Sequence, residues 1–315
     1  MTESAEEKVT QWEDLSRQHE TMTSLAWRRF RRHPGAIAGM IVLGIVLLVT
    51  LLAPLSPYSP TASNIPERLQ PPSWQHPFGT DPLGRDLLTR CLYGGRISLL
   101  VGFLVVMITM VIGIPIGALA GYFGGRLDNI LMRITDAMLA LPALLVLILL
   151  SAILREIEAP IFEKNNVLTI ALVIGILSWM SVARLVRATY LTVRELDFVT
   201  AANCVGAANL RIMTRHILPM AIGPIIVEST LEMGYAIMEE AGLSFLGFGI
   251  QPPTASWGNL LSNALEHMLK HPWLAVFPGL MIFLTIISIN YIGDGLRDAF
   301  DPYKVLEQSG EPRTK

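Results

Sequence analysis

The chain has 315 residues, of which 52% are hydrophobic and only 16% are charged. Ordinary soluble domains carry about 25% charged residues, so this deficit, together with long runs that lack charge, excludes a typical soluble domain and predicts a polytopic membrane protein. The net charge of −2 gives no indication of a nucleic-acid partner.

The N-terminal segment, residues 1–35, is predicted to be a cytosolic tail that ends in a basic anchor. Residues 1–23 are polar and acidic, which does not match a cleaved signal peptide. The run WRRFRR at 27–32 then combines arginines with aromatic rings, as expected where a tail meets the membrane surface. Specific recognition of lipid head groups is the alternative interpretation of this run.

The first predicted membrane span is the charge-free run at residues 36–54. Residues 55–96 are rich in Pro, Ser and Gly, which predicts an irregular extracytoplasmic segment. Within it, FGTDPLGRD at 78–86 predicts a turn closed by an Asp/Arg pair, and residues 86–93 are expected to form a short helix at the outer surface.

Residues 97–293 are predicted to form the core of the protein. Five further spans are expected there, at residues 97–125, 137–154, 167–183, 217–246 and 272–293. Small residues in the first of them, such as Gly117, allow close helix approach in lipid. A helix that begins at Asp128 leads into the next span. Arg133 and Asp136 lie three apart on this helix, which predicts a local ion pair or snorkelling of the side chains to the membrane surface or, alternatively, a contact with a partner protein.

Six spans place both termini on one side of the membrane. Of the 24 Lys and Arg residues, 17 fall in the two tails and in the segments after the second and fourth spans, whereas 7 fall in the outer segments. Because positive charge is retained on the cytosolic side, the tails at 1–35 and 294–315 and the loop at 184–216 are predicted to be cytosolic. Cys91 and Cys204 then lie on opposite sides of the membrane and cannot form a disulfide.

The segment LDFVTAANCVGAANLRIMTRHILP at 196–219 is polar and basic, although it lies between two apolar runs. Asp197 is predicted as the N-cap of a helix that stops at Gly206, and Asn209 as the cap of a second helix. Pro219 stands where the next apolar run begins. A compact helical hairpin on the membrane surface can be bound by another protein, so we expect a protein contact here.

The fifth span carries an acidic stripe. Glu228, Glu232, Tyr235 and Glu239 recur at helical spacing and fall within roughly 60° of one another, whereas Glu240 lies off this stripe. Carboxylates that face lipid are costly, so the stripe is expected to face protein or a water-filled cavity. It is either a buried polar seam between spans or the lining of a translocation path, where it would meet a cationic group such as a peptide amino terminus or a metal ion.

Several enzyme signatures are absent from the sequence. It contains no GxxxxGK[ST], no HExxH and no GxSxG, so no catalytic residue is predicted and no ATP is expected to bind this chain through a P-loop. His267 and His271 lie four apart beside Glu266. Because Pro272 ends any helix there and no third ligand follows, no metal site is predicted.

Two sets of motifs carry a family resemblance. TAA at 200–202, three residues, Gly206, nine residues and HILP at 216–219 resemble the EAA loop of binding-protein-dependent ABC importer permeases. Thr200 replaces the glutamate of that loop and His216 stands at the isoleucine, so a salt bridge made by this glutamate has no counterpart here. Over residues 25–305 the chain also resembles the second, C-type permease subunit of dipeptide, oligopeptide and nickel transporters, in FGTDPLGRD, YGGRISLLVG, GYFGGRLD, LSFLGFGIQPP, SWG and GDGLRDAFDP.

The resemblance implies an all-α polytopic membrane protein with six transmembrane helices and both termini cytosolic, in the cytoplasmic membrane of a prokaryote. It implies a non-catalytic subunit that contacts membrane lipid, pairs with a second permease subunit and receives solute from an extracytoplasmic binding protein. Two ABC ATPase subunits would bind ATP and Mg²⁺, and this chain would bind no cofactor.

The resemblance also implies the class of solute that is carried. The solute would be a dipeptide, an oligopeptide or a related small solute. Transport of nickel, glutathione or another solute, and peptide export, are the alternatives. A polytopic membrane enzyme is disfavoured, because the catalytic signatures are missing.

The same resemblance assigns roles to particular residues. Those that would couple the chain to an ATPase are Phe198, Val199, Thr200, Ala201, Ala202 and Gly206. Those that would line the translocation path are Glu228, Glu232, Tyr235 and Glu239. Gln251 and Trp257 would lie on the docking face for the binding protein.

Overall fold

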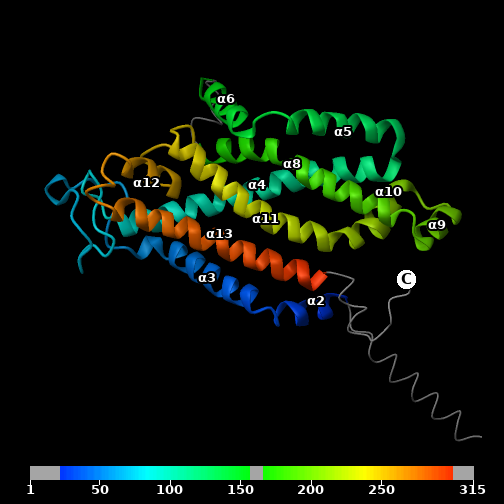
Figure 1. The fold of residues 1–315 in the computed structure, drawn as a ribbon, viewed down its shortest axis with the longest axis horizontal. Coiled ribbons are helices and arrows are strands. Elements are labelled where there is room, and N and C mark those ends of the chain that lie inside the picture. Colours follow the sequence, from blue (N-terminus) through cyan, green and yellow to red (C-terminus); the bar gives the residue numbers. More distant parts are fainter. Residues whose placement is uncertain (1–21, 157–165, 301–315) are drawn as a thin grey trace, which may run out of the picture.

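The computed structural model describes residues 22–156 and 166–300, and their regular structure is helical apart from one isolated bridge between Thr80 and Asp86. Five of the helices are long and apolar enough to cross a membrane, and they run side by side (Figure 1). They are α3 (Pro34–Leu51), α4 (Leu87–Phe123), α8 (Asn166–Val193), α11 (Leu218–Phe245) and α13 (Trp273–Phe300). The predicted all-α membrane fold is therefore confirmed.

The two ends of this bundle carry different segments. The short helix α2 (Met22–Phe30), the last turns of α13 and the helix α9 (Asp197–Cys204) lie at one end. The helix α12 (Trp257–Ala264) and residues 55–86 lie at the opposite end (Figure 1). The described parts of the predicted cytosolic tails thus lie at the same end as α9, and α12 lies at the opposite end with residues 55–86.

The third predicted span is broken. In place of one helix at residues 137–154, the chain forms α5 (Gly125–Leu139) and α6 (Ala143–Glu156), which are bent by 86° at the break between them. Pro142 explains the break, because proline has no N–H to donate and disfavours helical backbone in the residue before it. The prediction of one continuous helix is therefore wrong, and there are six spans only if the bent pair counts as one.

The external segment is organised by two aspartates. Asp81 accepts a hydrogen bond from Arg85 with 2.6 Å between Oδ2 and Nε, which confirms the predicted Asp/Arg turn. Asp86 is the N-cap of α4, and its carboxylate accepts from the backbone N–H of Thr89 at 2.7 Å. From this cap α4 continues unbroken into the apolar region, so the separate short helix predicted at residues 86–93 is wrong.

The helices α4 and α8 pack more closely than large side chains would permit. Gly113, Gly117 and Gly121 lie on one face of α4, one helical turn apart. A Cβ atom at Gly117 would lie 2.4 Å from the backbone oxygen of Ala183, and one at Gly121 would lie 2.7 Å from that of Arg187. The predicted close approach through small residues is therefore confirmed.

Replacing Gly117 by alanine is expected to destabilise the fold, because the added methyl group forces α4 and α8 apart. Overpacking of this kind costs about 1–3 kcal/mol. The measurement is the thermal unfolding midpoint of the purified protein in detergent. Gly44→Ala is the matched control, since a Cβ atom at Gly44 meets nothing within 4 Å. Equal midpoints for the two variants would contradict the close packing.

Candidate functional site

The hairpin that joins α8 to α11 consists of α9, the single turn α10 (Asn209–Arg211) and the π-helical segment η3 (Ile212–Ile217). Gly206 ends α9 with a φ angle of +78°, a conformation that glycine adopts without steric cost. The N–H groups of Gly206 and Ala207 bond to the carbonyls of Asn203 and Ala202 at 3.0 and 3.1 Å, the pattern of a Schellman motif. The predicted helix stop at Gly206 is confirmed.

Both predicted N-caps are wrong by one residue. The N-cap of α9 is Leu196, and the N-cap of α10 is Ala208. Asp197 is instead the first residue of α9, where its negative charge is stabilised by the helix dipole. Asn209 is the first residue of α10 and accepts a hydrogen bond from the hydroxyl of Tyr122 at 3.0 Å.

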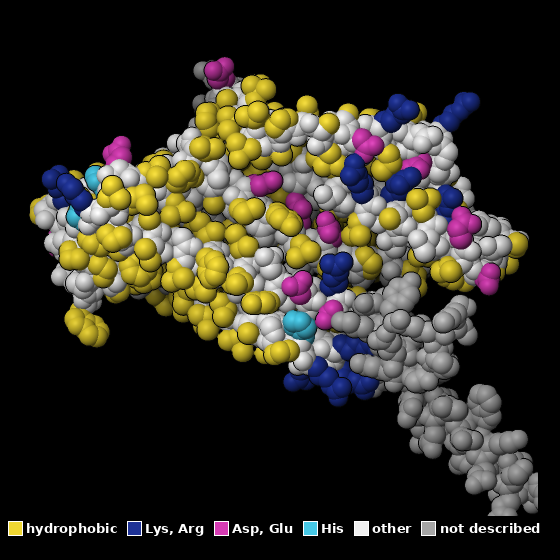
Figure 2. Space-filling model, viewed as in Figure 1, with side chains coloured by type: hydrophobic (Ala, Val, Ile, Leu, Met, Phe, Trp, Pro, Cys, Tyr) yellow, Lys and Arg dark blue, Asp and Glu magenta, His cyan; other side chains and the backbone are white. Residues whose placement is uncertain are grey.

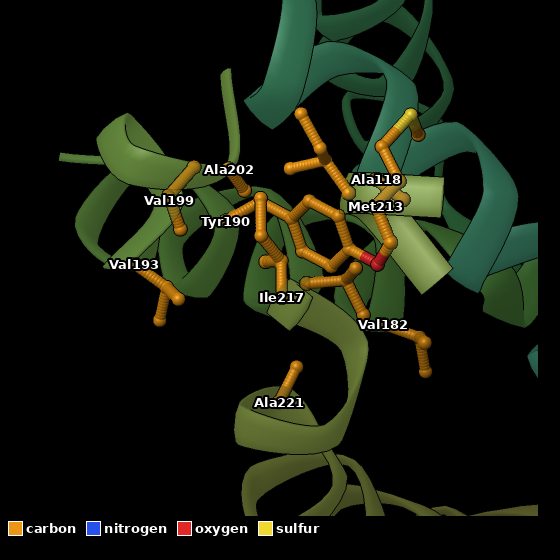
Figure 3. Packing of buried hydrophobic residues seen from close by; sticks show 11 residues of the cluster. Ala118, Val182, Tyr190, Val193, Val199, Ala202, Met213, Ile217 and Ala221 are labelled. Carbon is orange, nitrogen blue, oxygen red and sulfur yellow. The ribbon is translucent and has the colours of Figure 1, made fainter. Parts of the chain in front are cut away.

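A hydrophobic cluster, here called the hairpin core, holds the hairpin against α4, α8 and α11. It consists of Ala118, Val182, Val186, Tyr190, Val193, Val199, Ala202, Ile212, Met213, Ile217 and Ala221. Figure 3 shows these side chains gathered around the ring of Tyr190, which is itself 1% exposed. The hairpin is therefore packed onto the ends of the long helices and forms one body with them.

The six residues predicted to couple to an ATPase fall on two sides of the hairpin. Val199 and Ala202 are buried in the hairpin core, so they hold α9 in place and present no surface. The other four are exposed, namely Phe198, Thr200, Ala201 and Gly206. Val205 and Leu210, which are 83% and 72% exposed, add apolar area to the outer side of the hairpin. Exposed apolar patches of this kind are typical of protein interaction sites.

Polar contacts reinforce the hairpin core. The hydroxyl of Tyr190 on α8 donates to the backbone oxygen of Met213 in η3 at 3.0 Å. Nη1 of Arg194 donates to the backbone oxygens of Gly121 and Tyr122 at 3.0 and 3.3 Å. These two carbonyls belong to the C-terminal turn of α4, where a helix leaves its oxygens without partners of its own. The end of α8 is thus bonded both to η3 and to the end of α4.

Two ion pairs join α5 to α8. Arg187 binds both carboxylate oxygens of Asp128, with 2.6 Å between Nη2 and Oδ2, and Arg184 contacts Asp136. Asp136 therefore pairs across helices, and the predicted local pair with Arg133 is wrong. The reason is the break after α5, which leaves this helix lying along α8.

The acidic stripe of α11 runs from the protein interior onto an exposed face. Figure 2 shows acidic side chains in a line over α11, among hydrophobic side chains. Glu232 is only 7% exposed, on a helix that packs against α4, α8 and α13. Glu228 and Glu239 are half-buried, and Tyr235 is exposed. The residues predicted to line a path thus share one side of α11 at different depths.

The two residues predicted to face a binding protein differ in their surroundings. Trp257, the first residue of α12, is fully buried, and its Nε1 donates to the backbone oxygen of Cys91 at 2.9 Å. Its assignment as a docking contact is wrong, because the first turn of α12 lies against α4 at Cys91 and against α11 at Ala241. Gln251 is half-buried, and its side-chain amide donates to the carbonyl of Gly247 at 2.9 Å. Its role in docking stays a prediction.

Sequence reasoning missed the function of the most buried carboxylate of α11. Glu240, which helical spacing merely places off the stripe, has no exposed surface and accepts hydrogen bonds from the hydroxyls of Ser98 and Ser244. Ser244 lies one helical turn further along α11, and this spacing was the one available signal. Ser98 is 142 positions away in the sequence, so no local pattern could pair it with Glu240.

Comparisons with known proteins agree with this arrangement. The family described as binding-protein-dependent transport system inner membrane component matches residues 113–304. The family described as the N-terminal TM domain of oligopeptide transport permease C matches residues 21–72. The two matches together extend over most of the chain.

Individual relatives are similar over nearly their whole length. The dipeptide transport system permease protein DppC of Bacillus subtilis (strain 168) is 40% identical over 299 residues, which cover 94% of this chain and 91% of the relative. DppC of Haemophilus influenzae is 41% identical over 283 residues, which cover 88% and 93%. The oligopeptide transport system permease protein OppC of Bacillus subtilis is 38% identical over 291 residues, which cover 92% of each chain.

These matches confirm the resemblance inferred from the motifs. They extend from the N-terminal helices through the hairpin to the last long helix. The chain therefore belongs to the family of binding-protein-dependent transport system inner membrane components, the membrane-spanning permease subunits of ABC transporters.

Proposed function

We propose that this chain is one permease subunit of an ATP-driven importer that carries dipeptides, oligopeptides or a related small solute across the cytoplasmic membrane of a prokaryote. The observation that carries the proposal is the hairpin, which presents an exposed side at one end of the bundle while its other side is fixed in the hairpin core. A helix held in this way can transmit a push from a partner to α8 and α11, which flank it. The names of the relatives support the solute class.

The hairpin end of the bundle is assigned to the cytosol on the basis of charge. The run WRRFRR at 27–32 lies in and just after α2, and Arg194 and Arg211 belong to the hairpin segment between α8 and η3, while Arg184 and Arg187 lie in the half of α8 that leads to this segment. Positive charge is retained on the cytosolic side of membrane proteins. Both termini would then be cytosolic, and α12 with residues 55–86 would lie on the outer side.

The proposed partners are consistent with two features of this chain, the missing P-loop motif and the exposed side of α9. Two ABC ATPases would bind ATP and Mg²⁺ and hydrolyse the nucleotide, and this chain would supply no catalytic residue and bind no cofactor. The exposed side of α9, with Phe198 and Val205, would dock into an apolar groove of one ATPase. Closure of the ATPases would move α9 and tilt α8 and α11, a hinge-type change between inward-open and outward-open states. A second permease subunit and an extracytoplasmic binding protein would complete the importer.

The acidic stripe is proposed to line the translocation path at the contact with the second permease subunit. A carboxylate that faces lipid costs about 2.5–3.5 kcal/mol even on a lenient insertion scale, so the stripe is more stable beside water or protein. Glu228 lies on α11, which packs against α13. Glu232 and Glu239 extend the negative charge further along α11. A cationic group on the solute, such as a peptide amino terminus, would be attracted to them.

Reconstitution into vesicles tests the proposal as a whole. Vesicles that contain this chain, the second permease subunit and both ATPases should take up peptide only with ATP and a loaded binding protein, and omission of this chain should abolish uptake. Val205→Asp places a charge on the outer side of the hairpin, so it should weaken ATPase docking and lower uptake. Uptake that continues without the ATPases would contradict the proposal.

Replacing Gly206 by valine is expected to lower ATP-driven uptake about tenfold, because a side chain in the left-handed region costs about 1–2 kcal/mol. A Cβ atom at Gly206 meets nothing within 4 Å, so the effect comes from the backbone conformation and not from crowding. The measurement is uptake per ATP hydrolysed in the assembled complex. Gly206→Asn is the control, since asparagine tolerates this conformation, and equal uptake by both variants would argue against a fixed turn.

Replacing both Glu228 and Glu232 with glutamine is expected to raise the KM for peptides with a free amino terminus about fivefold, the effect of losing roughly 1 kcal/mol of charge attraction. Uptake of the same peptides with an acetylated amino terminus should change less. Glu266→Gln, in an exposed turn, is the matched control. If the double variant handles both kinds of peptide like the control, the stripe is a packing seam.

A further inference from the structure

A second polar cluster, here called the outer hub, lies at the end of α11 opposite the hairpin. It consists of Ser98 on α4, Glu240 and Ser244 on α11, and Trp257 at the start of α12. Oε1 of Glu240 accepts from the hydroxyl of Ser244 at 2.7 Å, and Oε2 accepts from the hydroxyl of Ser98 at 2.9 Å. One carboxylate with no exposed surface thus joins α4 to α11.

The oxygen of each of these two hydroxyls also accepts a hydrogen bond from the outer loop, residues 250–257. The backbone N–H of Ile250 donates to Oγ of Ser244 at 2.9 Å, and the backbone N–H of Trp257 donates to Oγ of Ser98 at 3.3 Å. The hydroxyls of Ser98 and Ser244 both donate to Glu240, so their oxygen lone pairs remain for the two N–H groups. Glu240 therefore fixes the two ends of the loop at residues 250–257 through two parallel chains of hydrogen bonds.

Close packing around the outer hub holds these hydrogen-bonded groups at their distances. A Cβ atom at Gly249 would lie 2.1 Å from Oγ of Ser244, and one at Gly258 would lie 2.6 Å from Cα of Ala241. The loop and α12 therefore lie directly against α11. A buried polar group without a hydrogen-bond partner raises the free energy of the folded state. The hydrogen bonds of such a cluster therefore form together and break together.

The helix α11 connects this cluster to the hairpin. The stretch Asn209–Phe245 is one continuous helical element, which includes η3. Its inner end is held in the hairpin core, where the backbone of Met213 accepts from Tyr190. Its outer end carries Glu240 and Ser244. If the hairpin moves α11 along its axis, the outer loop must therefore move with this helix, or else the hydrogen bonds of the outer hub must break.

We propose that the outer hub links the binding-protein side of the importer to α11, with Glu240 as the positioning residue that holds the loop at 250–257 and α12 to the same helix that the hairpin moves. Docking of a loaded binding protein on the outer surface would then bias α11, and through it the hairpin and the ATPases. This inference rests on the proposed function, and it adds a defined route by which the outer partner stimulates ATP hydrolysis on the other side of the membrane.

The test uses the complete complex of two permease subunits and two ATPases in lipid nanodiscs. ATP hydrolysis is measured with and without substrate-loaded binding protein. Stimulation of the wild-type complex is expected from the proposed function. In Glu240→Ala the stimulation should fall about tenfold, because two buried hydroxyls lose their shared acceptor. Hydrolysis without binding protein and assembly of the complex should stay at the wild-type level.

Variants that each remove one hydrogen bond of the outer hub distinguish a role of Glu240 in linking α11 to the outer loop from a role in stability alone. Ser98→Ala and Ser244→Ala each remove one of the two chains and should reduce the stimulation partly. Glu240→Gln should also retain part of it, because the amide oxygen accepts from one hydroxyl and the amide NH2 group donates to the oxygen of the other. Ser229→Ala, also on α11 but outside the outer hub, is the matched control. These variants decide the matter if Glu240→Ala does not assemble.

The outcomes distinguish the inference from the proposed function. Wild-type stimulation in all the outer-hub variants would overturn the inference and leave the proposed function intact. A parallel loss of stimulation, basal hydrolysis and assembly in the serine variants would also overturn it, since the cluster would then serve only stability. A wild-type complex that shows no stimulation at all would overturn the proposed function itself.

Discussion

The close approach of α4 and α8 is the constraint on which the rest of the structure depends. Between helices in lipid there is little hydrophobic driving force, so association relies on the contact of small residues and on a few polar bonds. Gly117 and Gly121 allow that contact over the half of α4 that ends beside the hairpin. Only at this separation does Arg194 reach the terminal carbonyls of α4. The same contact puts Tyr190 in the centre of the hairpin core.

From this contact outward, each element is held by the one before it. The end of α8 fixes η3 through Tyr190, η3 continues into α11, and α11 carries Glu240 to the opposite end of the bundle. The ion pairs of α5 with α8 add a further helix to the same body. The exposed outer side of α9 is thus the free surface of a unit that reaches from one end of the molecule to the other.

Sequence patterns predicted the features that depend on neighbouring residues. Charge-free runs located the long helices, and the glycine in the hairpin located the positive φ angle at Gly206. Features that depend on distant partners were not predictable. The pairing of Asp136 with Arg184 and the burial of Trp257 require knowledge of which helices are adjacent. The N-caps at Leu196 and Ala208 were missed by one residue, because residue preference locates a helix end only to within one or two residues.

The carboxylates of α11 fall into two physical classes, and the difference separates their roles. Glu240 is enclosed and bonded to two hydroxyls, so its carboxyl group holds protein groups and is not accessible to a solute. Glu228 and Glu239 are only half-buried, and helical spacing places them on the same face of α11 as the exposed Tyr235. A charge at such a position keeps its attraction for whatever occupies that face. The same helix can therefore be fixed at its outer end by one carboxylate and still offer others to a passing cation, because burial, and not residue type, decides which task each carboxylate performs.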